Sequence, residues 1–179
     1  MNIFFTDPNP VKAARNLDDK RVIKMILESA QMLCTALHFN KAANLAKYKS
    51  THANHPSNVW VRATDKNYEW LLMHFEALCT EYTYRYGKIH ASASLLADLK
   101  QGKQFIPTGD LQPFANCAAR QDMNLDMKWM NNTVNAYRYY MMKRWLKDTK
   151  PPKWTNRPPP KFLQVTKDIT DTLIKLGLQ

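Results

Sequence analysis

Apolar residues recur every three or four positions along most of the chain, and few stretches alternate with period two. This spacing predicts helices rather than strands. Prolines, glycines and polar turns place the helices at about 8–14, 18–38, 57–86, 91–100, 131–145 and 162–178. The expected fold class is therefore mainly α: a single compact helical domain, residues 1–179, with two long central helices.

The segments between these helices have distinct compositions. Residues 41–49 read as a short basic helix or loop, and residues 51–58 form a polar loop before the second long helix. Gly87 is expected to close that helix. Residues 150–161 are basic and proline-rich, which predicts an extended segment of polyproline character. Because this segment contains Trp154, we expect it to pack on the domain rather than act as a free linker.

The helix expected at 18–38 carries a narrow polar stripe. Arg21, Lys24, Glu28 and Gln31 fall in one row on its surface, and apolar residues fill most of the rest. A helix with one exposed side normally carries a wide polar face. The stripe therefore predicts a helix buried on most sides, with the stripe lining a cleft. A partly buried Glu28 could act as a general acid or base, while the alternative is an ordinary surface pair with Lys24.

The charge balance brings in a partner. Lysine and arginine total 26 against 15 acidic residues, so the formal net charge is +11 and the sequence pI about 9.6. Such an excess favours nucleic acid first and an anionic membrane surface second, with a merely basic soluble protein as the third reading. The expected nucleic-acid contacts lie on the stripe, in the polar loop, on the second long helix and in the proline-rich segment: Lys20, Arg21, Gln31, Lys49, His52, Asn54, His55, Arg62, Lys153 and Arg157.

Two of these groups have competing interpretations. The loop His52-Ala53-Asn54-His55-Pro56 could contact phosphates or bases, cap the following helix or, on weak grounds, bind a metal. The basic residues near Trp145 and Trp154 suit phosphate contact with base stacking, or form a solvated loop.

Several function classes lack their signatures. Three separated cysteines without a CxxC pair indicate neither a zinc ribbon nor a disulfide framework, and fit a reducing cytoplasm. The sequence has no P-loop, GxGxxG, HExxH, GxSxG or deaminase motif, no signal-peptide pattern and no apolar run of about 18 residues. We therefore expect no metal, no cofactor and no membrane partner.

The run from Asp19 to Glu28 resembles the first long helix of the pyrimidine-dimer DNA glycosylases of the endonuclease V type. In that family the catalytic glutamate follows an acidic residue by nine positions, as Glu28 follows Asp19, and Arg21 stands where the family has a histidine. The loop Tyr48-Lys49-Ser50-Thr51-His52-Ala53-Asn54-His55-Pro56 is similar to a tyrosine-lysine-asparagine-histidine-proline loop of microbial members. A group of uncharacterised phage proteins resembles the chain more closely. These resemblances cover about residues 1–87.

The resemblance implies a compact all-α enzyme that bends DNA and flips a base. Its nucleophile is a free N-terminal α-amine, which forms an imine with the deoxyribose C1′ before a lyase step breaks the backbone. Met1, Glu28 and Lys24 are then the catalytic candidates: Met1 for the amine, Glu28 for the sugar cation and proton transfer, Lys24 for orientation or as a substitute amine. The family's threonine after the initiator methionine is replaced by Asn2, whose bulk predicts that Met1 is retained. Leu27 and Gln31 stand where the family has arginines.

Together these patterns predict a DNA-binding base-excision enzyme, a DNA glycosylase with or without abasic-site lyase activity on damaged or modified bases. Its expected partner is double-stranded DNA, and its expected location is the cytoplasm, that of the host if the protein is viral. Two alternatives stay open: a non-catalytic nucleic-acid-binding protein, and an enzyme that processes a nucleotide or modified base in the same cleft. The sequence leaves the oligomeric state open.

Overall fold

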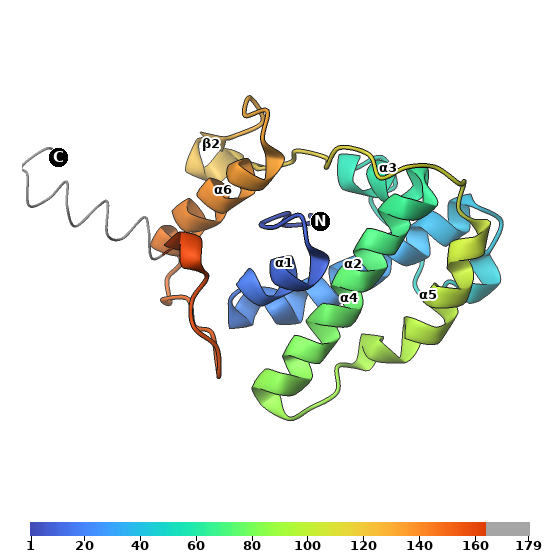
Figure 1. Ribbon diagram of the computed structural model, residues 1–179, viewed down its shortest axis with the longest axis horizontal. Helices are drawn as coiled ribbons and strands as arrows, with labels where there is room; N and C mark the ends of the chain where they lie inside the picture. Colours follow the sequence, from blue (N-terminus) through green and yellow to red (C-terminus); the bar gives the residue numbers. More distant parts are fainter. Residues whose placement is uncertain (164–179) are drawn as a thin grey trace, which may run out of the picture.

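Two long helices, α2 (Asp19–Phe39) and α4 (Asp65–Tyr86), pack against each other at the centre of the fold (Figure 1). The computed structural model describes residues 1–163, so nearly all of the helix expected at 162–178 lies outside the described residues. Helix α1 (Pro10–Asn16) packs on α4, and α3 (Pro56–Ala63) packs on both long helices. The mainly α fold with two long central helices is confirmed.

Shorter elements complete the described chain. They are the 3-10 helices Ala43–Leu45, Ala91–Leu95, Lys103–Phe105 and Gln121–Met123, the helices α5 (Leu96–Gly102) and α6 (Thr133–Lys147), and the strands β1 (Ala119–Arg120) and β2 (Leu125–Asp126). The two strands pair antiparallel, with Ala119 opposite Asp126. Such a sheet was not expected, because two-residue strands are too short to show a period of two.

The prediction of a single helix over 57–86 is wrong, because the helix is interrupted at Thr64. Thr64 is extended, with φ −142° and ψ 155°, and its hydroxyl accepts a hydrogen bond from the Asn67 N–H. Threonine is a favoured N-cap because its oxygen satisfies a free backbone donor of the first turn. The break separates α3 from α4, and Gly87, with φ 63°, ends α4 as expected.

Helix α2 is long and apolar enough to span a bilayer by length and composition alone. Most of it is buried in the domain, and buried core helices pass the same test. The narrow polar stripe therefore belongs to a helix that is buried on several sides, as the pattern predicted. Two apolar side chains beside the stripe, Ile23 and Leu27, are nevertheless exposed.

The first residues of the chain are part of the core. Ile3 and Phe5 are fully buried, and the Phe5 ring stacks on Phe114 with centroids 4.3 Å apart. Trp60 and Trp70 pack edge-on or tilted against Phe5. This aromatic cluster fixes the path of the N-terminal segment, whose end lies in the middle of the molecule, between α6 and α3 (Figure 1).

Residues 150–161 lie against α1, α2 and α4. The Trp154 indole N–H donates to the Asn16 carbonyl at 3.1 Å, and the Arg157 guanidinium makes two hydrogen bonds to the Glu81 carboxylate, at 2.5 and 2.6 Å. Thr155 binds Asp19 through its backbone N–H and its hydroxyl. The extended segment is therefore attached at several points along its length.

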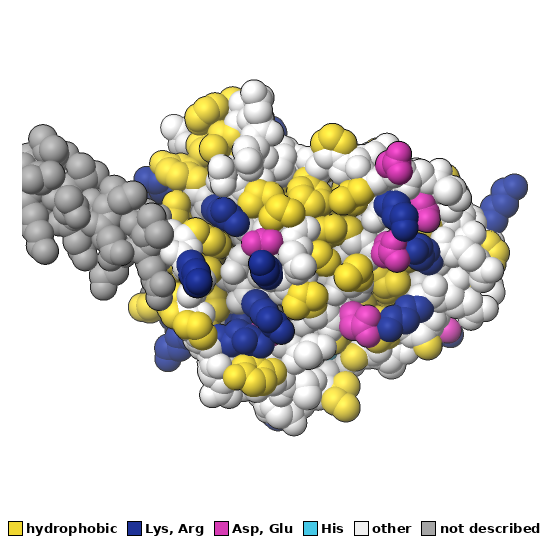
Figure 2. All heavy atoms as spheres, in the orientation of Figure 1, with side chains coloured by type: hydrophobic (Ala, Val, Ile, Leu, Met, Phe, Trp, Pro, Cys, Tyr) yellow, Lys and Arg dark blue, Asp and Glu magenta, His cyan; other side chains and the backbone are white. Residues whose placement is uncertain are grey.

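Charges are unevenly distributed over the surface. On the face shown in Figure 2, lysine and arginine side chains gather on the side of α1 and α6, whereas acidic side chains gather on the side of α4 and α5. The acidic groups there pair with lysines, as in Lys103–Glu69 at 2.7 Å and Lys100–Glu76 at 2.9 Å. On this face, lysine and arginine side chains without a neighbouring carboxylate are thus concentrated on the side of α1 and α6.

One buried histidine predicts a pH dependence of stability. His74 on α4 is fully buried, its Nδ1 bonds the Pro10 carbonyl, and burial lowers its pKa to about 4. In the unfolded chain a histidine titrates near 6.5, so between these pH values the unfolded state binds the extra proton. We expect the free energy of unfolding to fall by up to about 3 kcal/mol as the pH drops from 6.5 to 4.

Urea denaturation across this pH range measures the effect, with His74→Gln as the comparison. The variant lacks the titrating group, so its unfolding free energy should decline less steeply than that of the wild type. Equal slopes for the two proteins contradict the prediction.

Candidate active site

The carboxylate of Glu28 lies beside the N-terminus of the chain. The Asn2 backbone N–H donates to Glu28 Oε2 at 3.0 Å, and the Met1 α-amino nitrogen lies 4.0 Å from the same oxygen. Lys24 Nζ lies 3.3 Å from Oε1. The Glu28 side chain is 13% exposed, so a solute can reach it. The predicted Glu28–Lys24 pair exists at one carboxylate oxygen, and the Met1 α-amine lies near the other.

Asn2 is held by a segment distant in the sequence. Its side-chain Oδ1 accepts from the Tyr137 hydroxyl at 2.6 Å, and its Nδ2 donates to the Cys117 carbonyl at 3.3 Å. The Cys117 N–H in turn donates to the Tyr137 hydroxyl oxygen at 3.1 Å. These three residues form a closed set of hydrogen bonds that fixes the backbone on which the α-amine sits.

Tyr137 is suited to this task. It is buried, and burial raises its pKa well above 10, so its hydroxyl keeps its proton and donates to Asn2 at neutral pH. Nothing in the sequence pattern marks Tyr137 or Cys117, because their partners lie more than a hundred residues away in the chain.

We expect Tyr137→Phe to lower the unfolding free energy by about 1–3 kcal/mol, because Asn2 Oδ1 and the Cys117 N–H lose a partner. If the N-terminal amine is catalytic, its displacement should also slow the reaction about 10- to 100-fold. Denaturant unfolding and single-turnover rates measure the two effects. Tyr139→Phe, on the same helix but 38% exposed, is the control and should change neither.

Met1 is tied to the polar loop through Asn58. Met1 Sδ accepts from Asn58 Nδ2 at 3.1 Å, and the same amide nitrogen donates to the carbonyls of Thr51 and His52. The Met1 side chain is only 3% exposed. Its burial makes Met1 an integral part of the site.

His55 caps α3 and also faces this site electrostatically. Its Nδ1 accepts from the Ser57 N–H at 3.2 Å, which is the capping role among the alternatives. Burial lowers the pKa of His55, and the positive charges of the Met1 amine and His52 lower it further, while Glu28 acts in the opposite direction. A neutral imidazole beside Met1 and Glu28 is the resulting state near neutral pH.

The other predicted nucleic-acid contacts occupy varied environments. Lys49, His52 and Asn54 are exposed, Gln31 is half-buried, and Arg62 donates to the Ala53 carbonyl while its guanidinium lies 4.4 Å from the Phe39 ring centroid. Arg21 is buried against Asp18 and Asp148, and Arg157 is engaged with Glu81, so both have carboxylate partners within the fold. Their contact with nucleic acid stays a prediction.

Among residues 1–163, no group of three or more histidine, cysteine, aspartate or glutamate side chains is placed to hold a metal ion. The three cysteines are free thiols. Around Glu28 the structure brings together a carboxylate, a lysine amine, the imidazole of His55 and the α-amine of Met1.

The family model described as pyrimidine dimer DNA glycosylase matches residues 1–95. The chain belongs to this family. Membership makes DNA glycosylase chemistry the class of function, with DNA as the substrate and DNA repair as the setting. No curated protein and no solved structure matches the chain.

The matched part of this glycosylase contains Met1, Glu28 and Lys24, and runs from the N-terminus through α4 to the end of the 3-10 helix Ala91–Leu95. The residues that hold Asn2 lie beyond it, on α6 and the segment before it. The site therefore combines candidate catalytic residues from the part that matches the family with residues beyond that part, Cys117 and Tyr137, which hold Asn2 in place.

Proposed function

We propose that this chain removes a damaged or modified base from double-stranded DNA, with the Met1 α-amino group as nucleophile and Glu28 as the acid–base group. The observation that supports the proposal is the 4.0 Å distance between the Met1 nitrogen and Glu28 Oε2. An α-amine has an ordinary pKa of about 8, so a useful fraction is neutral and nucleophilic at physiological pH.

The reaction begins when the neutral amine attacks C1′ of the deoxyribose. The N-glycosidic bond breaks, and the base leaves with the bonding electrons and takes up a proton. The cation that develops on the sugar is stabilised by the carboxylate of Glu28. The attached amine then loses a proton to Glu28. The nitrogen lone pair forms the C=N bond as the C1′–O4′ bond breaks, and O4′ takes up the proton from Glu28, which leaves an open-chain imine between Met1 and C1′.

The imine makes a lyase step accessible. It acidifies the C2′–H bond, so loss of that proton to a base drives cleavage of the C3′–O bond, and the phosphate leaves with the bonding electrons. Hydrolysis of the imine by water then restores the Met1 amine. Glu28, whose Oε2 lies 4.0 Å from the Met1 nitrogen, is the proposed base for this proton.

The surroundings of Glu28 bear on the substrate. Ile23 and Leu27 on the same helix are 44% and 41% exposed, so the exposed face of α2 next to the polar stripe offers apolar contact. Lys24 and Asn2 each bind one carboxylate oxygen and so orient the group. We propose that the face of a base or of a sugar packs against the two apolar side chains while the Glu28 carboxylate lies close to C1′ of the target nucleotide.

Reductive trapping tests the proposal. The protein is incubated with borohydride and duplexes that carry an abasic site or one of a panel of damaged or modified bases. A covalent adduct, mapped by mass spectrometry to the peptide that begins with Met1, supports the mechanism, and the intact mass defines the first residue. Absence of both adduct and strand cleavage across the panel contradicts it.

The alternatives give different results in the same experiments. A non-catalytic binder shows salt-sensitive duplex affinity without turnover. An enzyme acting on a free nucleotide or base binds that small molecule near Glu28 and binds the duplex weakly.

A further inference from the structure

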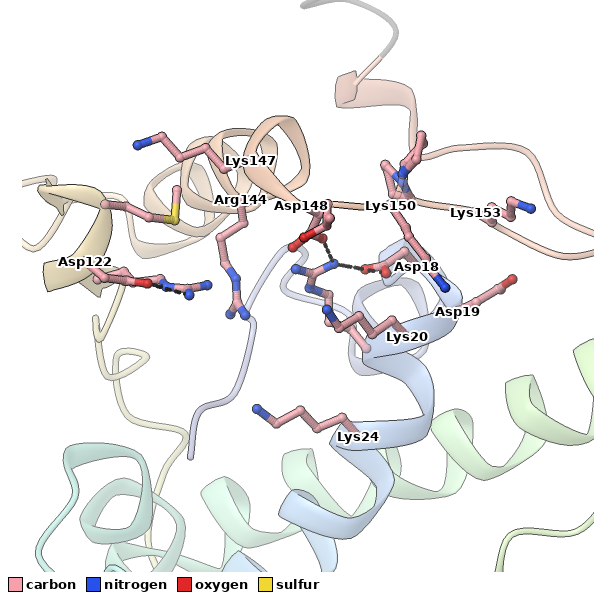
Figure 3. Close-up of a pocket in the computed structure, with 16 residues that line it drawn as sticks. Asp18, Asp19, Lys20, Lys24, Asp122, Arg144, Lys147, Asp148, Lys150 and Lys153 are labelled. Atoms are coloured by element: carbon pink, nitrogen blue, oxygen red, sulfur yellow. Dashed lines mark hydrogen bonds and ion pairs between the residues drawn. The ribbon is translucent and has the colours of Figure 1, made fainter.

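A hollow opens one helical turn along α2 from Glu28, at Lys24. It has a volume of about 910 Å³ and lies between the start of α2, the end of α6 with the segment after it, and the turn at Gln121–Met123 (Figure 3). Eight basic and four acidic side chains line it. We call it the α2–α6 cleft. Most of its wall comes from residues outside the family match, which ends at 95.

Every acidic group of the cleft has an arginine partner. Asp18 and Asp148 bind the same Arg21 nitrogen, at 3.1 and 2.5 Å, as the dashed lines in Figure 3 show. Asp19 binds Arg85, and Asp122 binds Arg120. Five cations of the lining make no ion pair with a carboxylate in residues 1–163: Lys20, Arg144, Lys147, Lys150 and Lys153. The α2–α6 cleft therefore presents net positive charge to whatever enters it.

Two arginines in the cleft have unused hydrogen-bond donors. Arg21 is 2% exposed, and its Nε and Nη2 have no partner. Arg144 Nε is also buried without a partner. The Arg144 guanidinium is held by aromatic rings rather than by a carboxylate, 5.6 Å from the Phe4 centroid and 5.7 Å from that of Tyr140. A fixed guanidinium with free donors matches the oxygens of a phosphate.

Lys24 joins this cleft to the candidate active site. Its side chain lines the α2–α6 cleft, extends into the same space as Arg144 and Lys20 (Figure 3), and reaches Glu28 Oε1 at 3.3 Å. Arg21 and Glu28 are seven residues apart on α2, which corresponds to about 10 Å along the helix axis. Successive phosphates of one DNA strand advance by about 3.4 Å along the duplex axis.

We propose that the α2–α6 cleft binds a backbone phosphate of the DNA strand that carries the target nucleotide, within about three nucleotides of the sugar at Glu28. The inference rests on the proposed function for the location of the target sugar. Arg144 supplies the principal contact, Lys20 and Lys24 add charge, and buried Arg21 supports the wall. The cleft thereby sets the register of the strand over Glu28.

Neutral linkages test the proposal. Duplexes with a stable abasic analogue carry one methylphosphonate, placed in turn at each linkage around it, and their affinity for the wild type is compared with that for Arg144→Gln. For the wild type, one linkage within three nucleotides should lower affinity about tenfold. Arg144→Gln should lose about tenfold on the fully charged duplex, and the same neutral linkage should then cost little more.

Lys143→Gln is the matched control, because Lys143 lies on α6 next to Arg144 but does not line the cleft. It should keep the position-specific loss of the wild type. The proposal is overturned if no neutral linkage within three nucleotides lowers duplex affinity, or if the neutral linkage lowers the affinity of Arg144→Gln by the same factor as that of the wild type. It is also overturned if inorganic phosphate occupies the cleft and leaves duplex affinity unchanged.

Trapping on a natural abasic duplex, run in parallel, separates the two proposals. If an adduct forms and the neutral linkage costs Arg144→Gln as much affinity as it costs the wild type, the phosphate contact is rejected and the proposed function stands. If no adduct forms and the neutral linkage costs Arg144→Gln little affinity, the phosphate contact stands and the proposed function is rejected.

Discussion

The Glu28→Gln variant is expected to form the trapped adduct about 10²- to 10⁴-fold more slowly than the wild type. Glutamine has nearly the same shape, and its amide oxygen can still accept from the Asn2 N–H that now lies 3.0 Å away. It cannot take up a proton from the Met1 amine, and it carries no charge to oppose a cation on the sugar. The loss should therefore appear in the chemical step, with duplex affinity nearly unchanged.

Single-turnover kinetics on an abasic duplex, together with a direct binding measurement, separate these effects. Glu76→Gln is the matched control: Glu76 is a carboxylate on α4 that pairs with Lys100 at the surface. It should react at the wild-type rate. A wild-type rate for Glu28→Gln would reject Glu28 as the acid–base group.

The second large effect concerns Arg21, which is expected to be essential for stability. Arg21→Met should lower the unfolding free energy by about 3–5 kcal/mol, because it leaves the buried Asp18 and the partly buried Asp148 without their shared cation. Burial acts to raise the pKa of Asp148, but Arg21 outweighs it and keeps that pKa below its ordinary value. Urea denaturation at neutral pH measures the loss.

Further variants show whether unpaired charge is the cause. Adding Asp18→Asn and Asp148→Asn to Arg21→Met removes the two orphaned charges and should recover a large part of the stability. Arg15→Met is the surface comparison, since Arg15 is 53% exposed and its pair with Glu81 is worth about 1 kcal/mol or less. Equal losses of unfolding free energy in Arg21→Met and Arg15→Met would show that Arg21 is not essential for stability.

The local part of the site follows from the sequence. The spacing of Lys24 and Glu28 on a mostly apolar helix is enough to predict their pairing and the partial burial of Glu28, since helical periodicity alone sets which residues share a row. Of the predicted row, Arg21 and Lys24 line the α2–α6 cleft, whereas Glu28 and Gln31 do not. Arg21 lies in the same row but is buried, because Asp148 approaches it from a segment that no local pattern connects to α2. Helical periodicity therefore predicted where Arg21 lies on α2 but did not predict its pairing with Asp148.

The non-local part could not be predicted in this way. The Tyr137 hydroxyl and the Cys117 backbone reach Asn2 through tertiary packing, and a tyrosine in a helix gives no sign of its partner. The interruption at Thr64 could be predicted only in part. Threonine is a known capping residue, but the apolar periodicity on both sides of it equally fits one continuous helix. Helix boundaries set by one side-chain hydrogen bond are harder to read than the helices themselves.

The hydrogen bond between Asn2 and Tyr137 spans 135 positions of the chain. Contacts of such sequence separation form late, because a long loop must close before they stabilise anything. During synthesis the N-terminus leaves the ribosome first, yet the hydrogen bonds of Asn2 with Tyr137 and Cys117 form only after α6 has also emerged. The proposed nucleophile would thus lack this part of its support in every chain that has not yet folded α6, so that full reactivity towards DNA is expected only after α6 has been made.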